Sequence, residues 1–353
     1  MTTIESPLDE LVTFLVDTPS VSGGEQELAD WVFAALSPYG HLSVVRDGNA
    51  VVARTSLGRG SRVILAGHLD TVPVADNLPS RREGSRLFGC GATDMKAGVA
   101  VMLSLAASVT SPRHDLTYVF YDCEEVEAVR NGLGRVARNH ADWLAGDLAI
   151  VMEPSTGEIE AGCQGTMRVE VTIPGKRAHS ARSWLGDNAI HGASELLNSL
   201  VWYEAREPVV DGIQYHEGLN AVAIHGGVAG NVIPDECVVT LNYRFAPDLD
   251  GVQAVDHLSE FLEEYGFPFV VTDLSEGARP GLDRLLVKDF VAAVGREPRA
   301  KFGWTDAARF SSLGVPALNW GPGDPNVAHS RGEYVDLPQL DECAGVLRSW
   351  LSP

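Results

Sequence analysis

Cysteine is scarce in this sequence, and no apolar segment is long enough to cross a membrane. The five cysteines are odd in number and never form a Cys-x-x-Cys pair; they are Cys90, Cys123, Cys163, Cys237 and Cys343. This excludes a dense disulfide framework and a thiolate zinc knuckle, and predicts reduced, mostly buried thiols. No apolar run approaches the roughly 20 residues that span a bilayer. The N-terminal segment also lacks the basic and apolar regions of a signal peptide. We therefore expect a cytoplasmic protein without a membrane partner.

Positive charge is also scarce. Lysine and arginine number 27 against 48 acidic residues, which gives a formal net charge of −21. Nucleic-acid binding is therefore not expected, because phosphate binding requires a basic surface. Hydrophobic residues make up 45% of the chain and charged residues 21%, as in globular proteins. The chain has 353 residues, which is longer than most chains that fold around a single hydrophobic core, so we expect two domains.

The hydrophobic pattern changes between helical and strand periods, which is typical of α/β proteins. Helical spacing predicts helices over residues 8–16 and 25–36, and a turn at 46–49 predicts a hairpin. Uninterrupted apolar stretches predict strands that are buried on both faces, at residues 63–66, 116–121 and 148–152. A helix over 95–109 is expected to follow the first of these strands.

The pattern differs between residues 166 and 279, where alternating segments and two helical segments predict a small α+β domain. Its strands are expected at 168–173, 221–228 and 237–245, and its helices at 188–203 and 251–265. The α/β pattern returns with segments at 282–294, 316–320 and 338–351. We therefore expect a mixed-sheet α/β/α catalytic domain of residues 1–165 and 280–353, interrupted by a smaller domain of residues 166–279.

Several acidic and histidine side chains follow the predicted buried strands. His68 ends the first strand, Glu124 and Glu125 follow the second, and Glu153 follows the third. Open α/β sheets place their sites outside the carboxyl ends of the strands, so these residues are expected to share one site. Asp70 stands two residues after His68 in an extended segment, from which it can orient the imidazole.

Five side chains of the metal-binding type lie in short motifs: His68, Asp94, Glu125, Glu153 and His329. Imidazole and carboxylate ligands suit zinc, cobalt or manganese, and three carboxylates supply enough charge for two divalent cations if one carboxylate bridges. Paired metals can activate a water molecule and polarise an amide carbonyl. Each motif also has a simpler structural explanation, such as Asp94 as a helix N-cap or Glu124 and Glu125 as an acidic helix start.

The order of these motifs resembles the aminoacylase and carboxypeptidase-type dimetal peptidase family. The similar segments are residues 66–73, 89–98, 123–125 and 152–154, with the late His329. The resemblance implies a dizinc catalytic domain interrupted by a lid domain that also forms a homodimer. It implies that His68 and Glu153 bind one metal, that Glu125 and His329 bind the other, and that Asp94 bridges them. Glu124 would act as general base and acid, and Asp70 would support His68.

The predicted insert carries similar pieces. Residues 177–181 resemble the lid segment whose histidine, here His179, reaches into the partner's site to stabilise an oxyanion, although Ser183 replaces a frequent proline. Residues 230–234 and 241–244 resemble the element that binds a substrate carboxylate through Asn231 and Arg244, and the planar guanidinium of arginine suits that task.

Two further stretches, residues 303–310 and 321–329, look most like the branch of the family that removes succinyl groups from N-succinyl amino acids. Thr305 and Asn326 would then contact this small-molecule substrate. Three alternatives stay open. They are an amidohydrolase for another N-acyl amino acid, such as an acetylated one, a carbamoyl-hydrolysing amidase, and a non-catalytic metal-binding dimer. The presence of Asp70 and Glu124 beside a complete ligand set argues against the last.

Overall fold

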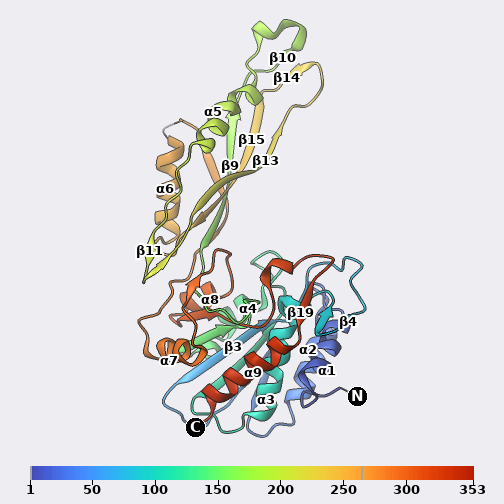
Figure 1. The fold of residues 1–353 in the computed structure, drawn as a ribbon. Helices are drawn as coiled ribbons and strands as arrows, with labels where there is room; N and C mark the ends of the chain where they lie inside the picture. The colour runs from blue at the N-terminus through green and yellow to red at the C-terminus, as the bar shows by residue number, and fades with distance from the viewer. Residues whose placement is uncertain (1, 264) are drawn as a thin grey trace. The chain divides into compact units, whose positions relative to one another are not determined.

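The computed structural model describes residues 2–263 and 265–353, and the chain divides into two compact units (Figure 1). The first unit contains Met1–Gly162, Pro280–Arg299 and Asp306–Pro353, and the second contains Cys163–Arg279 and Ala300–Thr305. The expected boundaries differ in two respects, since residues 163–165 and 300–305 were both predicted to lie with the first unit. They belong to the second because Lys301 O accepts the Gln164 N–H at 3.1 Å and Trp304 Nε1 donates to Glu276 O at 3.0 Å.

A mixed eight-stranded sheet forms the centre of the first unit. Strand β3 lies between β6 and β7 and is parallel to both, and β18 is parallel to β7. The antiparallel hairpin of β1 and β2 turns at Gly48 and extends the sheet beyond β6. In sheet order the strands are β1 (Ser43–Asp47), β2 (Ala50–Arg54), β6 (Asp115–Tyr121), β3 (Arg62–His68), β7 (Leu148–Val151), β18 (Ala317–Asn319), β8 (Glu160–Ala161) and β17 (Arg299–Ala300).

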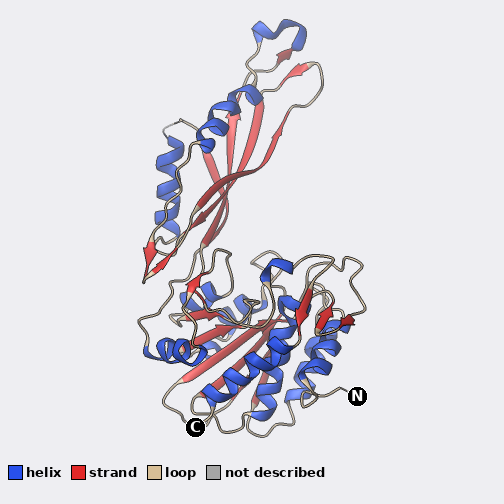
Figure 2. Cartoon of the chain, viewed as in Figure 1, coloured by secondary structure: helices blue, strands red, loops and turns tan. Residues whose placement is uncertain are grey.

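Helices and the apolar strands bury most of the apolar side chains of this unit. The helices are α1 (Leu8–Asp17), α2 (Gln26–Leu36), α3 (Ala97–Ser108), α4 (Gly132–Asn139), α7 (Leu285–Val294), α8 (Ala307–Ser312) and α9 (Pro338–Leu351). Helix α3 is buried almost all round and packs against α1 and α9. Short helical turns lie at Ala92–Lys96, Ala141–Leu144 and Pro325–Val327, and a small sheet contains β4 (Arg81–Glu83), β5 (Arg86–Phe88) and β19 (Tyr334–Asp336). Figure 2 shows the alternation of helices and strands.

Two predicted helices begin later than the sequence pattern indicated. The helix expected over 95–109 begins at Ala97, because Asp94 and Met95 have non-helical backbone angles. The interpretation of Asp94 as its N-cap is therefore wrong. The helix expected from residue 282 begins at Leu285. The other helices and strands predicted for this unit are confirmed within about two residues, the usual uncertainty of element ends.

The second unit has a four-stranded antiparallel sheet in the order β13 (Gly218–Gly226), β15 (Glu236–Phe245), β9 (Gly165–Pro174) and β16 (Phe269–Ser275). Alternate residues of β9 and β15 are buried, and together with α5 (Ala189–Val201) and α6 (Gly251–Glu263) they form a separate core. Asn188 caps α5 by accepting the N–H groups of Ile190 and His191. Smaller pairs are β10 (Ala178–His179) with β14 (Val232–Ile233), and β11 (Val209–Val210) with β12 (Ile213–Gln214), and a short helical turn follows β10 at Ser180–Leu185.

Two expectations from composition can be compared with this structure. All five cysteines are free and buried, as predicted. Over the described residues, the structure contains no helix that is both long and apolar enough to span a bilayer.

Candidate metal centre

His68 ends strand β3, and its ring is buried. Its Nδ1 lies 3.0 Å from the backbone carbonyl oxygen of Asp70, while the Asp70 carboxylate is 3.6 Å away. The imidazole is therefore oriented mainly by the backbone of Asp70 and only secondarily by its side chain. A neutral ring would carry its proton on Nδ1 because of this contact, and Nε2 lies 3.1 Å from Asp94 Oδ1.

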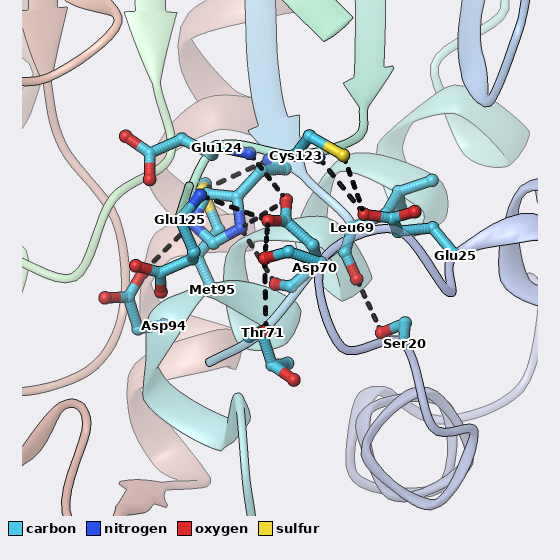
Figure 3. A network of polar contacts seen from close by, with 12 residues as sticks. Ser20, Glu25, Leu69, Asp70, Thr71, Asp94, Met95, Cys123, Glu124 and Glu125 are labelled. Carbon is cyan, nitrogen blue, oxygen red and sulfur yellow. Dashed lines mark hydrogen bonds and ion pairs between the residues drawn. The ribbon is translucent and has the colours of Figure 1, made fainter. Parts of the chain in front are cut away.

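The Asp70 carboxylate has a further role that the sequence did not indicate. It is fully buried and accepts the backbone N–H groups of Glu124 at 2.9 Å and Glu125 at 3.1 Å. The hydroxyl of Ser22 also donates to it, at 2.7 Å. In Figure 3 this carboxylate points toward the backbone of Glu124 and Glu125. Asp70 therefore supports the turn that carries the expected base and one expected ligand.

Asp94 and the two histidines form the centre of the cluster. The Oδ1 atom of Asp94 contacts His68, and its Oδ2 atom lies 3.2 Å from Nε2 of His329. The same Nε2 atom lies 2.9 Å from Glu125 Oε1. Ligand atoms of His68, Asp94 and Glu125 all lie within 4.8 Å of one another. One carboxylate that contacts two different imidazoles is the arrangement expected of a bridging ligand.

Glu153 follows β7 and is 7% exposed. Its charge contributes to the raised pKa values of His68 and Glu124. The structure therefore brings four of the five residues proposed as metal ligands into direct contact, and Glu153 follows the strand next to β3. The five residues come from three strand ends, the loop before α3, and the segment before β19.

The charges of the cluster suit bound cations. Hydrogen bonds with Asp94 and Glu125 raise the pKa of His329 to about 10. Burial alone would lower the pKa of His68, but Asp94 and Asp70 outweigh it and raise the pKa well above its usual value. Among the described residues, Asp94 and Glu125 form ion pairs with these imidazoles only and with no lysine or arginine. The negative charge of these carboxylates is thus offset by protons on the two imidazoles, which a bound cation can replace. The imidazole and carboxylate groups suit divalent zinc, cobalt or manganese as ligands.

Glu124 is partly buried beside this cluster. Burial raises its pKa, the positive charge of His68 opposes this, and the carboxylates of Asp306 and Glu153 raise the pKa further. A carboxyl group with a raised pKa is suited to accept and return a proton near neutral pH. The alternative of an acidic helix start is wrong, because the next helix, α4, begins only at Gly132.

The residues expected to bind substrate lie in both units. His179 ends β10, is exposed, and accepts the Ala181 N–H on Nδ1 at 3.0 Å. Asn231 stands beside it, because β10 pairs with β14 and Asn231 O accepts the Ser180 N–H. Arg244 lies on β15, half-buried, with Nε donating to Asn242 Oδ1 at 3.2 Å. Thr305 is buried in the second unit, and Asn326 is exposed in the first, three residues before His329.

Three residues near the cluster were missed by the sequence reasoning: Ser22, Glu25 and Glu333. The Glu25 carboxylate is buried and accepts the N–H groups of Gly23 at 2.7 Å and Cys123 at 3.2 Å. Glu333 is 1% exposed and accepts backbone N–H groups of the Asp94 loop. Glu25 was expected only to begin a helix. Ser22 and Glu333 were isolated polar side chains outside the predicted elements, a signal that ordinary solvated residues share.

The comparisons with known proteins agree with this geometry. The chain belongs to peptidase family M20/M25/M40, whose model matches residues 64–352. A protein of Mycobacterium tuberculosis, provisionally named succinyl-diaminopimelate desuccinylase, is 54% identical over 343 residues, or 97% of each chain. Succinyl-diaminopimelate desuccinylase of Corynebacterium glutamicum is 50% identical over 96% of this chain and 94% of its own. Acetylornithine deacetylase of Myxococcus xanthus is 31% identical over 85% of this chain and 82% of its own.

Solved structures show the same fold at low sequence identity. A tripeptidase of Staphylococcus aureus has a TM-score of 0.77 and 22% identity, covering 98% of this chain and 97% of its own. A dinuclear metal-binding peptidase of Bacillus subtilis has a TM-score of 0.71 and 17% identity, covering 98% of this chain and 96% of its own. With this fold, its family and the histidine and carboxylate cluster, the chain is a metal-dependent hydrolase of amide bonds.

Proposed function

We propose that this chain hydrolyses N-succinyl-LL-2,6-diaminopimelate to succinate and LL-2,6-diaminopimelate, a step of lysine biosynthesis. The observation that carries this proposal is identity of 54% and 50%, over nearly the whole chain, to two proteins named for that reaction. The first unit would be the catalytic domain, and the second would be the lid and dimerisation domain.

The metal ligands are carried over from the resemblance to the family, and the contacts of Asp94 and the two histidines support them. His68 and Glu153 would hold one zinc ion, Glu125 and His329 the other, and Asp94 would bridge, since its two oxygens contact different imidazoles. Cobalt or manganese also suits these donors. When bound, two such cations lower the pKa of a water molecule and polarise the amide carbonyl.

Glu124 would carry the proton during the reaction. Its carboxylate takes a proton from the attacking water and later returns it to the nitrogen of the departing amine. Two backbone hydrogen bonds to Asp70 hold the turn, so Glu124 is positioned before substrate arrives. His179 of the neighbouring subunit would donate to the developing oxyanion, a preorganised contact that strengthens as charge appears on that oxygen.

Arg244 would bind a carboxylate of the substrate with Asn231, and Thr305 and Asn326 would also contact the substrate. Among the described residues its guanidinium forms no ion pair, and its Nε bonds only to the neutral Asn242. Burial, and then the neighbouring charge of Arg168, lower its pKa, although the charge of Asp273 opposes them. Within the described part of the chain, Arg244 is therefore a partly buried cation without an ion-pair partner. A substrate carboxylate can supply that partner in bidentate fashion.

The homodimer would form through the second unit. Strand β13 is an outer strand of its sheet, and Val222 and Ile224 on it are 57% and 47% exposed. Val201 and Trp202, at the end of α5, are 73% and 76% exposed. An uncovered strand edge beside exposed apolar side chains is typical of a surface that pairs with another chain.

A substrate panel tests the proposed function. The zinc-loaded chain is assayed with N-succinyl-LL-2,6-diaminopimelate, N-acetylornithine and a carbamoyl amino acid, and metal content is measured on the same sample. We expect the succinyl substrate to have the highest kcat/KM. Preference for N-acetylornithine would favour the deacetylase alternative, to which the Myxococcus xanthus relative points. Preference for the carbamoyl substrate would favour the amidase alternative. Metal binding without turnover of any substrate would favour the non-catalytic dimer.

A further inference from the structure

We propose that Glu333 is a positioning residue of the metal centre: its carboxylate holds the Asp94 loop and connects that loop to the segment that carries His329. Oε2 accepts the Gly91 N–H at 3.0 Å, and Oε1 accepts those of Thr93 at 3.0 Å and Asp94 at 3.1 Å. One buried carboxylate thus binds three N–H groups in the loop that ends at the bridging ligand.

The Asp94 loop needs such a partner because its backbone is irregular. Asp94 and Met95 have non-helical angles, and the regular helix begins only at Ala97. Gly91 has a φ of 75°, and a Cβ atom there would lie 2.4 Å from the Thr71 side chain. The N–H groups of Gly91, Thr93 and Asp94 bond to Glu333, and a buried N–H without a partner is strongly unfavourable. Without the carboxylate, the loop would have to rearrange and move Asp94 with it.

The main chain of Glu333 ties the same loop to the segment of His329. Its carbonyl oxygen accepts the Gly89 N–H at 3.1 Å, and its N–H donates to Ser330 O at 3.1 Å. Strand β19 begins at the next residue and pairs with β5. Glu333 therefore connects two segments far apart in the sequence, where Asp94 Oδ2 and His329 Nε2 meet at 3.2 Å. Asp94 would be shared by both metals, but His329 belongs to the proposed second metal site alone, so that site depends most on Glu333.

The chemistry of the contact requires a carboxylate of this length. Two acceptor oxygens serve three donors, and a carboxylate brings no donor of its own. A glutamine would keep one oxygen for Thr93 and Asp94, but its NH2 group would face the Gly91 N–H. An alanine would lose all three bonds. Glutamine should therefore displace Asp94 less than alanine does.

The test measures zinc binding for the full chain and for Glu333→Gln and Glu333→Ala, with zinc content after dialysis and zinc titration as readouts. We expect the affinity of the second zinc to fall about 10- to 100-fold in the alanine variant and less in the glutamine variant. The first zinc, held by His68 and Glu153, should be affected less. With N-succinyl-LL-2,6-diaminopimelate as substrate, kcat of both variants should fall at subsaturating zinc while KM changes little. Excess zinc should restore part of the lost kcat.

A matched control separates positioning from general stability. Asp115 is also a buried carboxylate that accepts N–H groups of a loop, those of Leu57 and Arg59, but it lies away from the ligands. Asp115→Asn should lower the unfolding temperature and leave both zinc sites intact. Equal loss of both zincs in Asp115→Asn, or wild-type zinc affinity in folded Glu333→Ala, would overturn the inference. If the alanine variant does not fold, wild-type zinc affinity in Glu333→Gln would overturn it equally.

The kinetic part of this inference rests on the proposed function, and the zinc titration does not. A wild-type chain that binds two zinc ions but does not cleave the succinyl substrate would refute the proposed function. In that case selective loss of the second zinc in the Glu333 variants would still support the role of Glu333.

Discussion

Single residues of the candidate site are held in unusual backbone conformations. Cys123, directly before Glu124, has a φ of 57°, and His329 has a φ of 58°. Residues other than glycine adopt this region at a cost, and they keep it only where surrounding contacts hold them. Here those contacts are visible, since Glu25 binds the Cys123 N–H and Glu125 binds the His329 ring. The site geometry is therefore imposed by neighbouring side chains.

Glu124→Gln should abolish turnover while leaving two metals per chain. Glutamine has nearly the same shape but cannot take a proton from water, so kcat is expected to fall about 10²- to 10⁴-fold. Steady-state kinetics and metal analysis of the same preparation measure both quantities. Glu127→Gln is the control, because the Glu127 side chain is 75% exposed and pairs only loosely with Arg130. Wild-type turnover in the Glu124 variant would refute the assigned base.

Asp115→Asn should destabilise the chain at neutral pH and much less in acid. Burial alone would raise the pKa of Asp115, but the N–H groups of Leu57 and Arg59 and the Thr55 hydroxyl outweigh it and lower the pKa. A lowered folded-state pKa stabilises the fold above the unfolded value of about 4, and this contribution is lost as pH falls toward the folded value.

Urea unfolding at about pH 7 and about pH 3.5 measures this pH dependence. We expect the substitution to cost about 1–3 kcal/mol at the higher pH, the range for a buried acceptor that loses bonds. The difference between variant and wild type should shrink at the lower pH. A difference that is constant across this range would contradict the pKa direction.

At the scale of elements, the order of the strands decides which side chains meet. Strand β3 lies between β6 and β7 and is parallel to both. Their carboxyl ends therefore share one edge, where His68, Glu125 and Glu153 follow their strands. In the second unit, the outer position of β13 leaves a strand edge that a partner chain can use.

Ile224→Lys should weaken the proposed dimer. A charged side chain on an outer strand opposes pairing with another strand edge, which is how monomeric proteins protect such edges. Sedimentation or light scattering across a concentration series measures the dimer dissociation constant, and we expect it to rise at least about tenfold. Val252→Lys is the control on an exposed apolar residue of α6, 71% exposed and away from β13. Equal dimerisation of wild type and Ile224→Lys would argue against this interface.

At the scale of the whole molecule, the first unit is assembled from three separate stretches of chain. His329 lies in the last of them, and the other four proposed ligands lie in the first. Cations held by both stretches would stabilise the folded unit, because binding to the native state alone shifts the folding equilibrium.

Chelation should therefore remove activity and lower the unfolding temperature together. A ligand present at about 100 times its dissociation constant adds about 2.7 kcal/mol, which scanning fluorimetry detects. Added zinc or cobalt should restore both properties. In His329→Ala the effect of chelation on the unfolding temperature should be smaller. An unfolding temperature that does not respond to chelator or zinc in the wild type would contradict a cation-bound centre.

The sequence predicted the elements well where the pattern was strong. Apolar runs such as 63–66 and 148–152 gave buried strands, and helical spacing gave α1 and α9, because periodic burial leaves a periodic pattern. The start of α3 was predicted wrongly, since residues 95 and 96 suit a helix locally. The hydrogen bonds to Glu333 hold the preceding loop in another conformation.

By itself, the sequence determined the composition of the site: two imidazoles and three carboxylates in motifs that suit divalent metals, with Glu124 next to a ligand. It could not show how these side chains meet, because strand order and loop packing depend on contacts between residues far apart in the chain. Only the tertiary structure showed that the Asp70 carboxylate holds the Glu124 turn, that its backbone orients His68, and that Glu333 holds the Asp94 loop. Such roles depend on burial and hydrogen-bond partners, which residue type does not encode.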